Sequence, residues 1–143
     1  MRKIDSVIIH CSDSRWGCAS AIEDWHKERG FTAIGYHYVI NNPYAFCVDS
    51  TPAIDRDGLI EVGRGIEEVG AHCKGRNDNS IGICLIGKDM FTGKQFDSLR
   101  QLLNDIETKL EHSFRVYAHH ELDKKKTCPN IEPGWLRAFL LRS

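Results

Sequence analysis

The sequence lacks an excess of charge of either sign, because its 143 residues include 19 Lys and Arg against 20 Asp and Glu. This balance gives no electrostatic reason to expect a nucleic-acid or membrane partner, and we expect neither.

Long hydrophobic runs are also missing. The apolar run near the N-terminus is only Val7–Ile9, and no segment approaches the roughly 20 apolar residues of a membrane-spanning helix. We therefore expect no membrane insertion and no signal peptide, so the sequence predicts a cytoplasmic protein.

Internal repeats and low-complexity segments are absent as well. A chain of this length can bury one real core but not comfortably two, so we expect a single domain over residues 1–143.

The six cysteines are Cys11, Cys18, Cys47, Cys73, Cys84 and Cys128. They would suggest disulfides in a short secreted protein, but the apolar segments here can build a core without cross-links. We expect free thiols and a monomer.

The secondary structure is predicted from hydrophobic periodicity. Strands are expected at 7–9, 36–40, 59–62, 81–86 and 115–118, where β-branched and aromatic residues gather. Helices are expected at about 21–29, after Thr92, where an apolar stripe runs to Leu110, and from Pro133 onwards. Ser20 with Glu23 and Thr92 with Gln95 have the spacing of capping boxes. A mixed β-sheet flanked by helices follows, which is an α/β or α+β fold.

Two histidines and a cysteine stand where a metal site could form. His10 ends the first predicted strand, His119 follows the last one, and Cys128 comes nine positions later. Should these strands be neighbours, two imidazoles and a thiolate would meet with no evident fourth ligand, which is typical of a hydrolytic zinc site with an open position for water. Each residue also has a simpler interpretation: a surface histidine, a small buried cysteine, or a histidine that caps a strand.

Six blocks of sequence together carry a family resemblance. They are Val7–Ser12, Trp25–Phe31, Gly35–Ile40, Val69–Gly75, Asn79–Gly87 and Lys126–Pro129. In this order they resemble the zinc-dependent N-acetylmuramoyl-L-alanine amidases of the phage T7 lysozyme type, which are relatives of the peptidoglycan recognition proteins. The resemblance covers about 7–135. It implies a groove for peptidoglycan or muropeptides and hydrolysis of the amide between N-acetylmuramic acid and L-alanine by a zinc-activated water.

The resemblance also implies roles for individual residues. His10, His119 and Cys128 would bind one zinc ion, although His120 beside His119 leaves the choice of imidazole open. Tyr36 and Lys126 would be catalytic; their simpler interpretations are a core aromatic and a solvated charge. His72 would bind substrate, and Glu121 would orient the loop or a ligand. His37 is expected to face away from Tyr36 by strand alternation, and His26 to be structural.

Residues 41–55 depart from the family pattern as an insertion in the hairpin. It would narrow the groove, select a stem peptide, dock a partner, or be a tolerated surface loop. Cys47 within it could pair with Cys18 after export, a hypothesis that counting free thiols in the native protein would test. The protein would act on the cell wall after release or export, as a phage or prophage endolysin or as a wall-remodelling enzyme. The alternative is a recognition module that binds peptidoglycan without cutting it, although such relatives typically lack the cysteine ligand.

Overall fold

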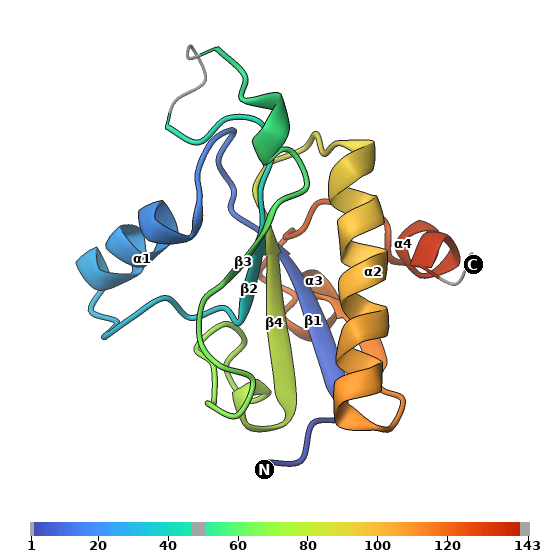
Figure 1. Ribbon diagram of the computed structural model, residues 1–143. Helices are drawn as coiled ribbons and strands as arrows, with labels where there is room; N and C mark the ends of the chain where they lie inside the picture. The colour runs from blue at the N-terminus through green and yellow to red at the C-terminus, as the bar shows by residue number, and fades with distance from the viewer. Residues whose placement is uncertain (1, 47–50, 141–143) are drawn as a thin grey trace.

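A five-stranded sheet forms the centre of the computed structural model, which describes residues 2–46 and 51–140 (Figure 1). Its strands are β1 (Ser6–Cys11), β2 (Tyr38–Ile40), β3 (Ile60–Val62), β4 (Ser80–Leu85) and β5 (Arg115–Ala118). The order across the sheet is β3-β2-β4-β1-β5. Strand β3 is antiparallel to β2, and the other neighbours are parallel. The predicted mixed sheet is confirmed, with β4 at its centre.

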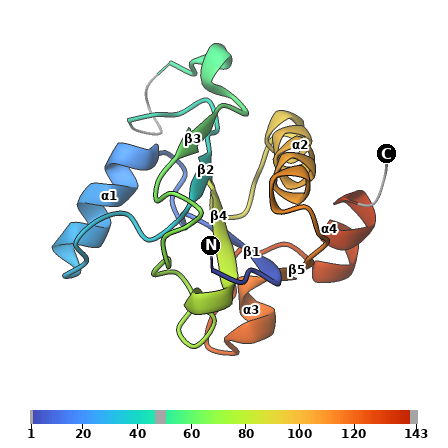
Figure 2. The same cartoon turned by 60° about the horizontal axis from the view of Figure 1, so that its bottom comes forward.

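Helices cover both faces of this sheet. Helix α1 (Ala19–Glu28) lies on one side, and α2 (Gly93–Leu110) and α4 (Pro133–Leu140) lie on the other, as both views show (Figures 1 and 2). The short α3 (His119–Leu122) follows β5, and 3-10 turns occupy Ile54–Arg56 and Asn77–Asn79. The result is a three-layer α/β fold. No helix within the described ranges is long and apolar enough to cross a membrane.

Strand alternation divides the core into two clusters and decides which face carries the chemistry. In β4, Ile81 and Ile83 pack in the cluster that contains the apolar stripe of α2, whereas Cys84 packs with Ile22 of α1. In β1, Val7 and Ile9 belong to the α2 cluster. Because successive side chains of a strand point to opposite faces, His10 points to the α1 face.

The N-terminus of α2 is tied to the sheet through Gln95. The predicted capping box is confirmed, since Thr92 Oγ1 accepts from the Gln95 backbone and the Gln95 side chain accepts from the Thr92 backbone. The same side chain is fully buried, and its Nε2 donates to the carbonyls of Ile40 and Ile86 at 3.1 and 2.8 Å. One amide group therefore satisfies the ends of two strands and one helix.

We expect Gln95→Ala to destabilise the protein by about 2–4 kcal/mol, because it leaves buried carbonyls unpaired and opens a small cavity. The shift of the urea unfolding midpoint measures this loss. The exposed Gln101, whose Nε2 donates to Asp105 in the same helix, offers the matched control, and Gln101→Ala should be nearly neutral. Equal losses in the two variants would contradict the assigned bridging role.

Two predicted boundaries were wrong for tertiary reasons. Helix α1 begins at Ala19, not at residue 21, and its N-cap Cys18 makes no side-chain cap. The cap comes from β3 instead, where Glu61 Oε1 accepts from the Ala19 backbone N–H at 3.0 Å. Strand β2 begins at Tyr38, not at residue 36. Tyr36 packs in the α1 cluster while Tyr38 packs in the α2 cluster, so regular alternation does not extend back to Tyr36.

The described part of the insertion packs against the loop between β1 and α1. Asn42 Nδ2 donates to the Arg15 carbonyl at 2.9 Å, and the Gly17 backbone N–H donates to the Tyr44 carbonyl at 2.9 Å. Cys47, predicted to pair with Cys18, lies outside the described residues. These contacts make the start of the insertion a brace for the loop that follows β1.

Candidate active site

Strands β1 and β5 are parallel neighbours, so their carboxyl ends meet at one edge of the sheet. Ile9 pairs with Ala118 in register, which places the next residues, His10 and His119, side by side. Their Nδ1 atoms lie 3.1 Å apart, and both side chains are buried. The adjacency that the predicted site requires is therefore present.

Cys128 returns to this point from the loop after α3. Its Sγ accepts from the Cys11 backbone N–H at 2.9 Å, and its carbonyl accepts from the His120 backbone N–H at 2.9 Å. The His120 ring also bonds to that carbonyl, at 3.1 Å, so His120 stabilises the loop that carries Cys128. The ligand atoms of His10, His119 and Cys128 all lie within 4.8 Å of one another, and His120 is outside this group.

The donor set fits a zinc ion. Two nitrogens at about 2.0–2.1 Å from a tetrahedral ion lie roughly 3.4 Å apart, close to the separation of the His10 and His119 Nδ1 atoms. Burial lowers the pKa of both imidazoles, which keeps lone pairs free for a cation. The neighbouring Cys11 thiol and burial raise the pKa of the Cys128 thiol. A bound cation would therefore be needed to keep the Cys128 sulfur as a thiolate at neutral pH.

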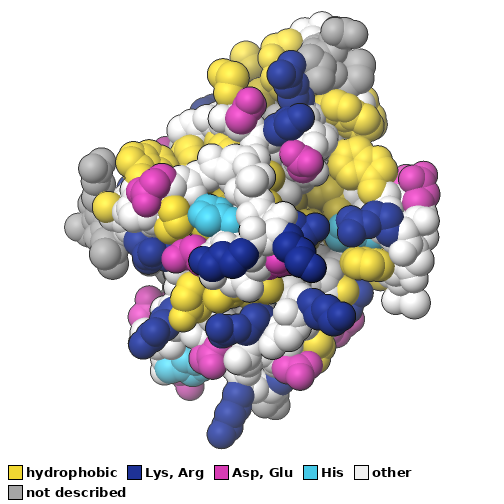
Figure 3. All heavy atoms as spheres, turned by 180° about the vertical axis from the view of Figure 1, so that it is seen from behind, with side chains coloured by type: hydrophobic (Ala, Val, Ile, Leu, Met, Phe, Trp, Pro, Cys, Tyr) yellow, Lys and Arg dark blue, Asp and Glu magenta, His cyan; other side chains and the backbone are white. Residues whose placement is uncertain are grey.

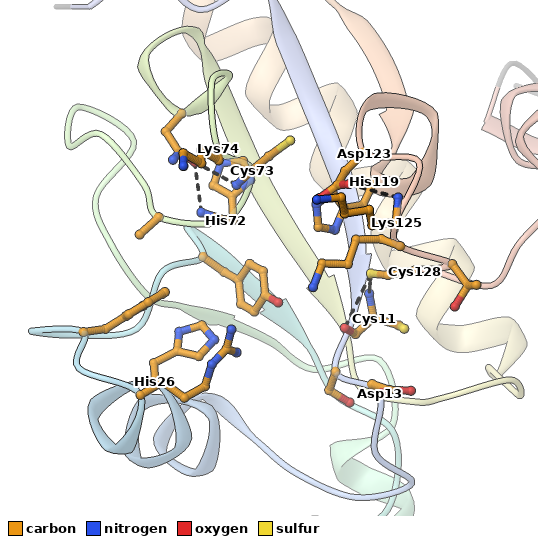
Figure 4. Close-up of a pocket in the computed structure, with 18 of the residues that line it drawn as sticks. Cys11, Asp13, His26, His72, Cys73, Lys74, His119, Asp123, Lys125 and Cys128 are labelled. Atoms are coloured by element: carbon orange, nitrogen blue, oxygen red, sulfur yellow. Dashed lines mark hydrogen bonds between the residues drawn. The ribbon is translucent and has the colours of Figure 1, made fainter.

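A groove of about 560 Å³ on the α1 side is lined in part by His119 and Cys128, while His10 is buried beside them. Figure 4 shows His72 and Cys73 on one wall, His26 from α1 below, and His119, Lys125 and Cys128 on the opposite wall. Figure 3, which views the molecule from behind, shows histidine atoms at the surface with lysine and arginine side chains close by. The basic side chains that line the groove are Arg29, Lys74, Lys125 and Lys126, and the acidic ones are Asp13 and Asp123. The groove is thus suited to a ligand that carries carboxylates.

Tyr36 lies over the candidate metal ligands. Its ring centroid is 4.9 Å from that of His10 and 5.3 Å from that of His26. Burial raises the pKa of the Tyr36 phenol well above its ordinary value, so the hydroxyl keeps its proton at neutral pH. The group is placed and protonated as a hydrogen-bond donor would be.

Lys126 lies on the loop that leads to Cys128. Its side chain is exposed and lines the groove, and its charge contributes to the lowered pKa of His119. Lys125 lines the same groove, while Lys124 is not among the lining residues. The sequence gives no signal for Lys125, because a run of three lysines does not show which side chains turn inwards.

The remaining histidines near the site have distinct partners. His26 Nδ1 accepts from the Gly35 backbone N–H at 2.9 Å, which ties α1 to the segment before β2. His37 Nδ1 accepts from the Gly82 backbone N–H at 3.0 Å, and its ring lies 5.8 Å from that of His72. His72 lines the groove and contacts His10. Tyr36 and His37 both precede β2, so the strand alternation from which opposite faces were expected does not extend to them.

Glu121 lies behind the site rather than in the groove. Its Oε1 accepts from the Ala118 backbone N–H at 2.8 Å and from Arg137 Nη1 at 2.7 Å. Through these bonds it holds the turn that starts with His119 against α4. Among the described residues it bonds to the backbone before His119 and to Arg137, and it makes no hydrogen bond to the side chain of a candidate ligand.

The buried histidines predict a pH-dependent stability in the metal-free protein. Burial lowers the pKa of His10, His26, His37, His72 and His119, and that of His72 falls to about 3. Unfolded imidazoles titrate near 6.5, so the unfolded chain binds more protons below that pH. We expect the urea midpoint of chelator-treated protein to fall between about pH 6.5 and pH 5. An unchanged or higher midpoint at pH 5 would contradict this expectation.

Comparisons with known proteins identify the family and the fold of this chain. The family model described as N-acetylmuramoyl-L-alanine amidase (Amidase_2) matches residues 1–131. The endolysin of Escherichia phage T7 is 36% identical over 139 residues, which cover 90% of this chain and 82% of the endolysin.

Solved structures show the same fold. The N-acetylmuramoyl-L-alanine amidase LysC from Clostridium intestinale URNW superposes with a TM-score of 0.79 at 23% identity, covering 99% of this chain and 88% of that one. The ectodomain complex of peptidoglycan recognition proteins LCa and LCx with bound tracheal cytotoxin gives a TM-score of 0.70 at 26% identity, with 90% and 77% coverage. Since the family match spans nearly the whole chain and the T7 endolysin is similar over most of both lengths, the chain belongs to the N-acetylmuramoyl-L-alanine amidase family Amidase_2.

Proposed function

We propose that this protein hydrolyses the amide bond between N-acetylmuramic acid and the L-alanine of the peptidoglycan stem peptide, with one zinc ion held by His10, His119 and Cys128. The observation that carries the proposal is the convergence of two imidazole nitrogens, 3.1 Å apart, and one cysteine sulfur, with His119 and Cys128 lining the groove and His10 buried beside them. Two histidines and a thiolate suit zinc better than harder cations. The protein would act on the cell wall as an endolysin or a remodelling enzyme.

When bound, zinc supplies a Lewis acid that polarises a carbonyl and lowers the pKa of water towards about 7. The chain supplies the other groups. Tyr36, held protonated over the site, donates a hydrogen bond to the oxygen of the scissile amide as negative charge develops there. The Lys126 ammonium, which lines the same groove, stabilises the same charge and can deliver a proton to the leaving amine.

The substrate fits the charge of the groove. Stem peptides carry free carboxylates, and four basic side chains against two acidic ones line the groove. The tracheal cytotoxin bound by the related recognition proteins supports a peptidoglycan-derived ligand for this fold. The described residues of the insertion are not among those lining the groove, which favours a brace over a specificity loop.

Digestion of purified peptidoglycan by the zinc-loaded protein tests the proposal. Mass analysis should find free stem peptides that begin with L-alanine, and a chelator should prevent their release while added zinc restores it. Cleavage that persists after complete metal removal would contradict the metal assignment. Intact sacculi that retain the protein would instead indicate a recognition module.

Lys126 and Lys125 can be separated by substitution. We expect Lys126→Ala to lower kcat by about 10- to 100-fold, because a charge that stabilises the transition state is lost. Lys125→Ala should mainly raise KM, because this side chain lines the groove without the same influence on His119. Lys124→Ala, outside the groove lining, is the matched control and should change neither. A lower kcat in Lys125→Ala than in Lys126→Ala would reverse the assignment.

A further inference from the structure

His72, which the family resemblance places on the substrate side, has both ring nitrogens engaged within the protein. Its Nδ1 lies 2.9 Å from His10 Nε2, and its Nε2 lies 3.3 Å from Ser80 Oγ. No ring nitrogen is left to bind substrate. We propose that His72 is a positioning residue that fixes the tautomer and the orientation of His10. This inference rests on the proposed role of His10 as a metal ligand.

The direction of each hydrogen bond follows from one backbone carbonyl. Ser80 Oγ lies 2.7 Å from the Arg76 carbonyl, which can only accept, so the single hydroxyl proton of Ser80 is used there. Ser80 Oγ must then accept from His72 Nε2–H. A neutral imidazole with its proton on Nε2 has a lone pair on Nδ1, so His72 Nδ1 accepts from His10 Nε2–H. The lone pair of His10 is left on Nδ1.

The lone pair on His10 Nδ1 is the one that a metal ion at this site would require. His10 Nδ1 is the atom that faces His119 Nδ1 at 3.1 Å, where the ion would lie. Histidines that bind metals generally donate their other ring N–H to a fixed acceptor, and removing the acceptor typically lowers metal affinity by about 10- to 100-fold. In this protein the acceptor is a second imidazole, held in turn by a serine and a backbone carbonyl.

Close packing around the His72 ring restricts the positions that the ring can adopt. A Cβ built on Gly82 would come within 2.6 Å of the His72 ring, and one built on Gly70 would come within 2.7 Å. Both positions therefore need glycine so that the imidazole can lie flat beside β4. Gly82 pairs with Ile8 of β1, two residues before His10. The space made in β4 is thus adjacent to the strand that carries the metal ligand.

The backbone of His72 is fixed independently of its ring. Asn77 Oδ1 accepts from the backbone N–H groups of His72 and Cys73, each at 2.9 Å. The Asn77 side chain thereby sets the position from which the His72 ring extends, while Ser80 orients the ring's far nitrogen. Contacts to backbone, ring edge and ring nitrogen all restrict the same side chain, as expected of a group that positions another.

Imidazole NMR of the metal-free protein tests the tautomer without requiring activity or metal. Two-bond proton–nitrogen spectra should show His10 protonated on Nε2 and His72 protonated on Nε2. A wild-type His10 that carries its proton on Nδ1 would overturn the inference even if the enzyme is a zinc amidase. This measurement therefore separates failure of the positioning role from failure of the proposed function.

A matched pair of variants tests the consequence for metal binding. Leu and Asn have nearly the same shape, but the Asn side-chain oxygen can take the place of His72 Nδ1 as acceptor, whereas Leu offers none. In competition with a fluorescent chelator, His72→Leu should raise the zinc dissociation constant by about 10- to 100-fold. His72→Asn should stay close to wild type. Ser80→Ala, which removes only the anchor of the ring, should fall between them.

The outcomes distinguish three roles for His72. If His72→Leu binds zinc as wild type does but has a raised KM, the residue binds substrate and the inference is wrong. If both variants lower the melting temperature of the metal-free protein equally and leave zinc affinity unchanged, the role is structural, and the inference is again wrong. A wild-type protein that binds no zinc would overturn the proposed metal site together with this inference.

Discussion

Replacing Cys128 with serine is expected to lower amidase activity by about 10³-fold or more, because a poorly coordinating hydroxyl takes the place of the thiolate that helps to hold the metal. The sulfur is fixed by the Cys11 backbone N–H and lies within the group formed with His10 and His119. The variant should retain the fold, since serine can accept the same backbone hydrogen bond. Release of L-alanine-terminated peptides and zinc content after dialysis measure the two effects.

A second cysteine supplies the control for this substitution. Cys18 is buried like the other core cysteines, but its Sγ lies beside Ser20 Oγ at the start of α1, and it is not among the residues lining the groove. Cys18→Ser should therefore keep both zinc and activity. Normal activity in Cys128→Ser, with zinc still bound, would exclude the thiolate as a required ligand.

Replacing Tyr36 with phenylalanine is expected to lower kcat by about 10²–10³-fold with little change in zinc affinity. One preorganised donor to a developing oxyanion typically contributes this much. The substitution removes only a hydroxyl, so packing of the ring against the α1 cluster is retained. Because burial keeps the phenol protonated, the loss should be the same across neutral pH. Steady-state kinetics on a soluble muropeptide measure kcat and KM separately.

Tyr38→Phe is the matched control for this prediction. Tyr38 is only two positions away but packs in the α2 cluster, and it is not among the residues that line the groove over the candidate site. The loss of its hydroxyl should leave kcat unchanged. Equal reductions in both variants would mean that Tyr36 acts through the fold, and a raised KM without a change in kcat would make Tyr36 a binding group.

Local sequence determined much of the fold. The β-branched runs of β1 and β4, the apolar stripe of α2 with its capping box and the Pro133 start of α4 all appear as predicted, because each depends on periodicity within a few residues. The order of six blocks carried the family resemblance. Together these features gave a mixed sheet with His10 and His119 at strand ends.

Other features depend on contacts that no local pattern encodes. The N-terminus of α1 is capped by Glu61, 42 positions away from Ala19, so the boundary predicted from Ser20 and Glu23 was wrong. The face of Tyr36 depends on where regular alternation ends, and this is decided by the pairing of Tyr38 with Ile83 in β4. A one-residue irregularity in a strand reverses the face of every earlier side chain.

The sequence by itself therefore determined which residues could bind a metal, because ligand chemistry belongs to the side chain and strand ends follow from local periodicity. The tertiary structure alone decided which groups surround them: Lys125 in the groove, Glu121 behind it, and His72 hydrogen bonded to His10 across 62 positions. The physical reason is that hydrogen-bond direction and side-chain face depend on distances of a few ångströms, and these are set only when the parallel strands pair and their helices pack against them.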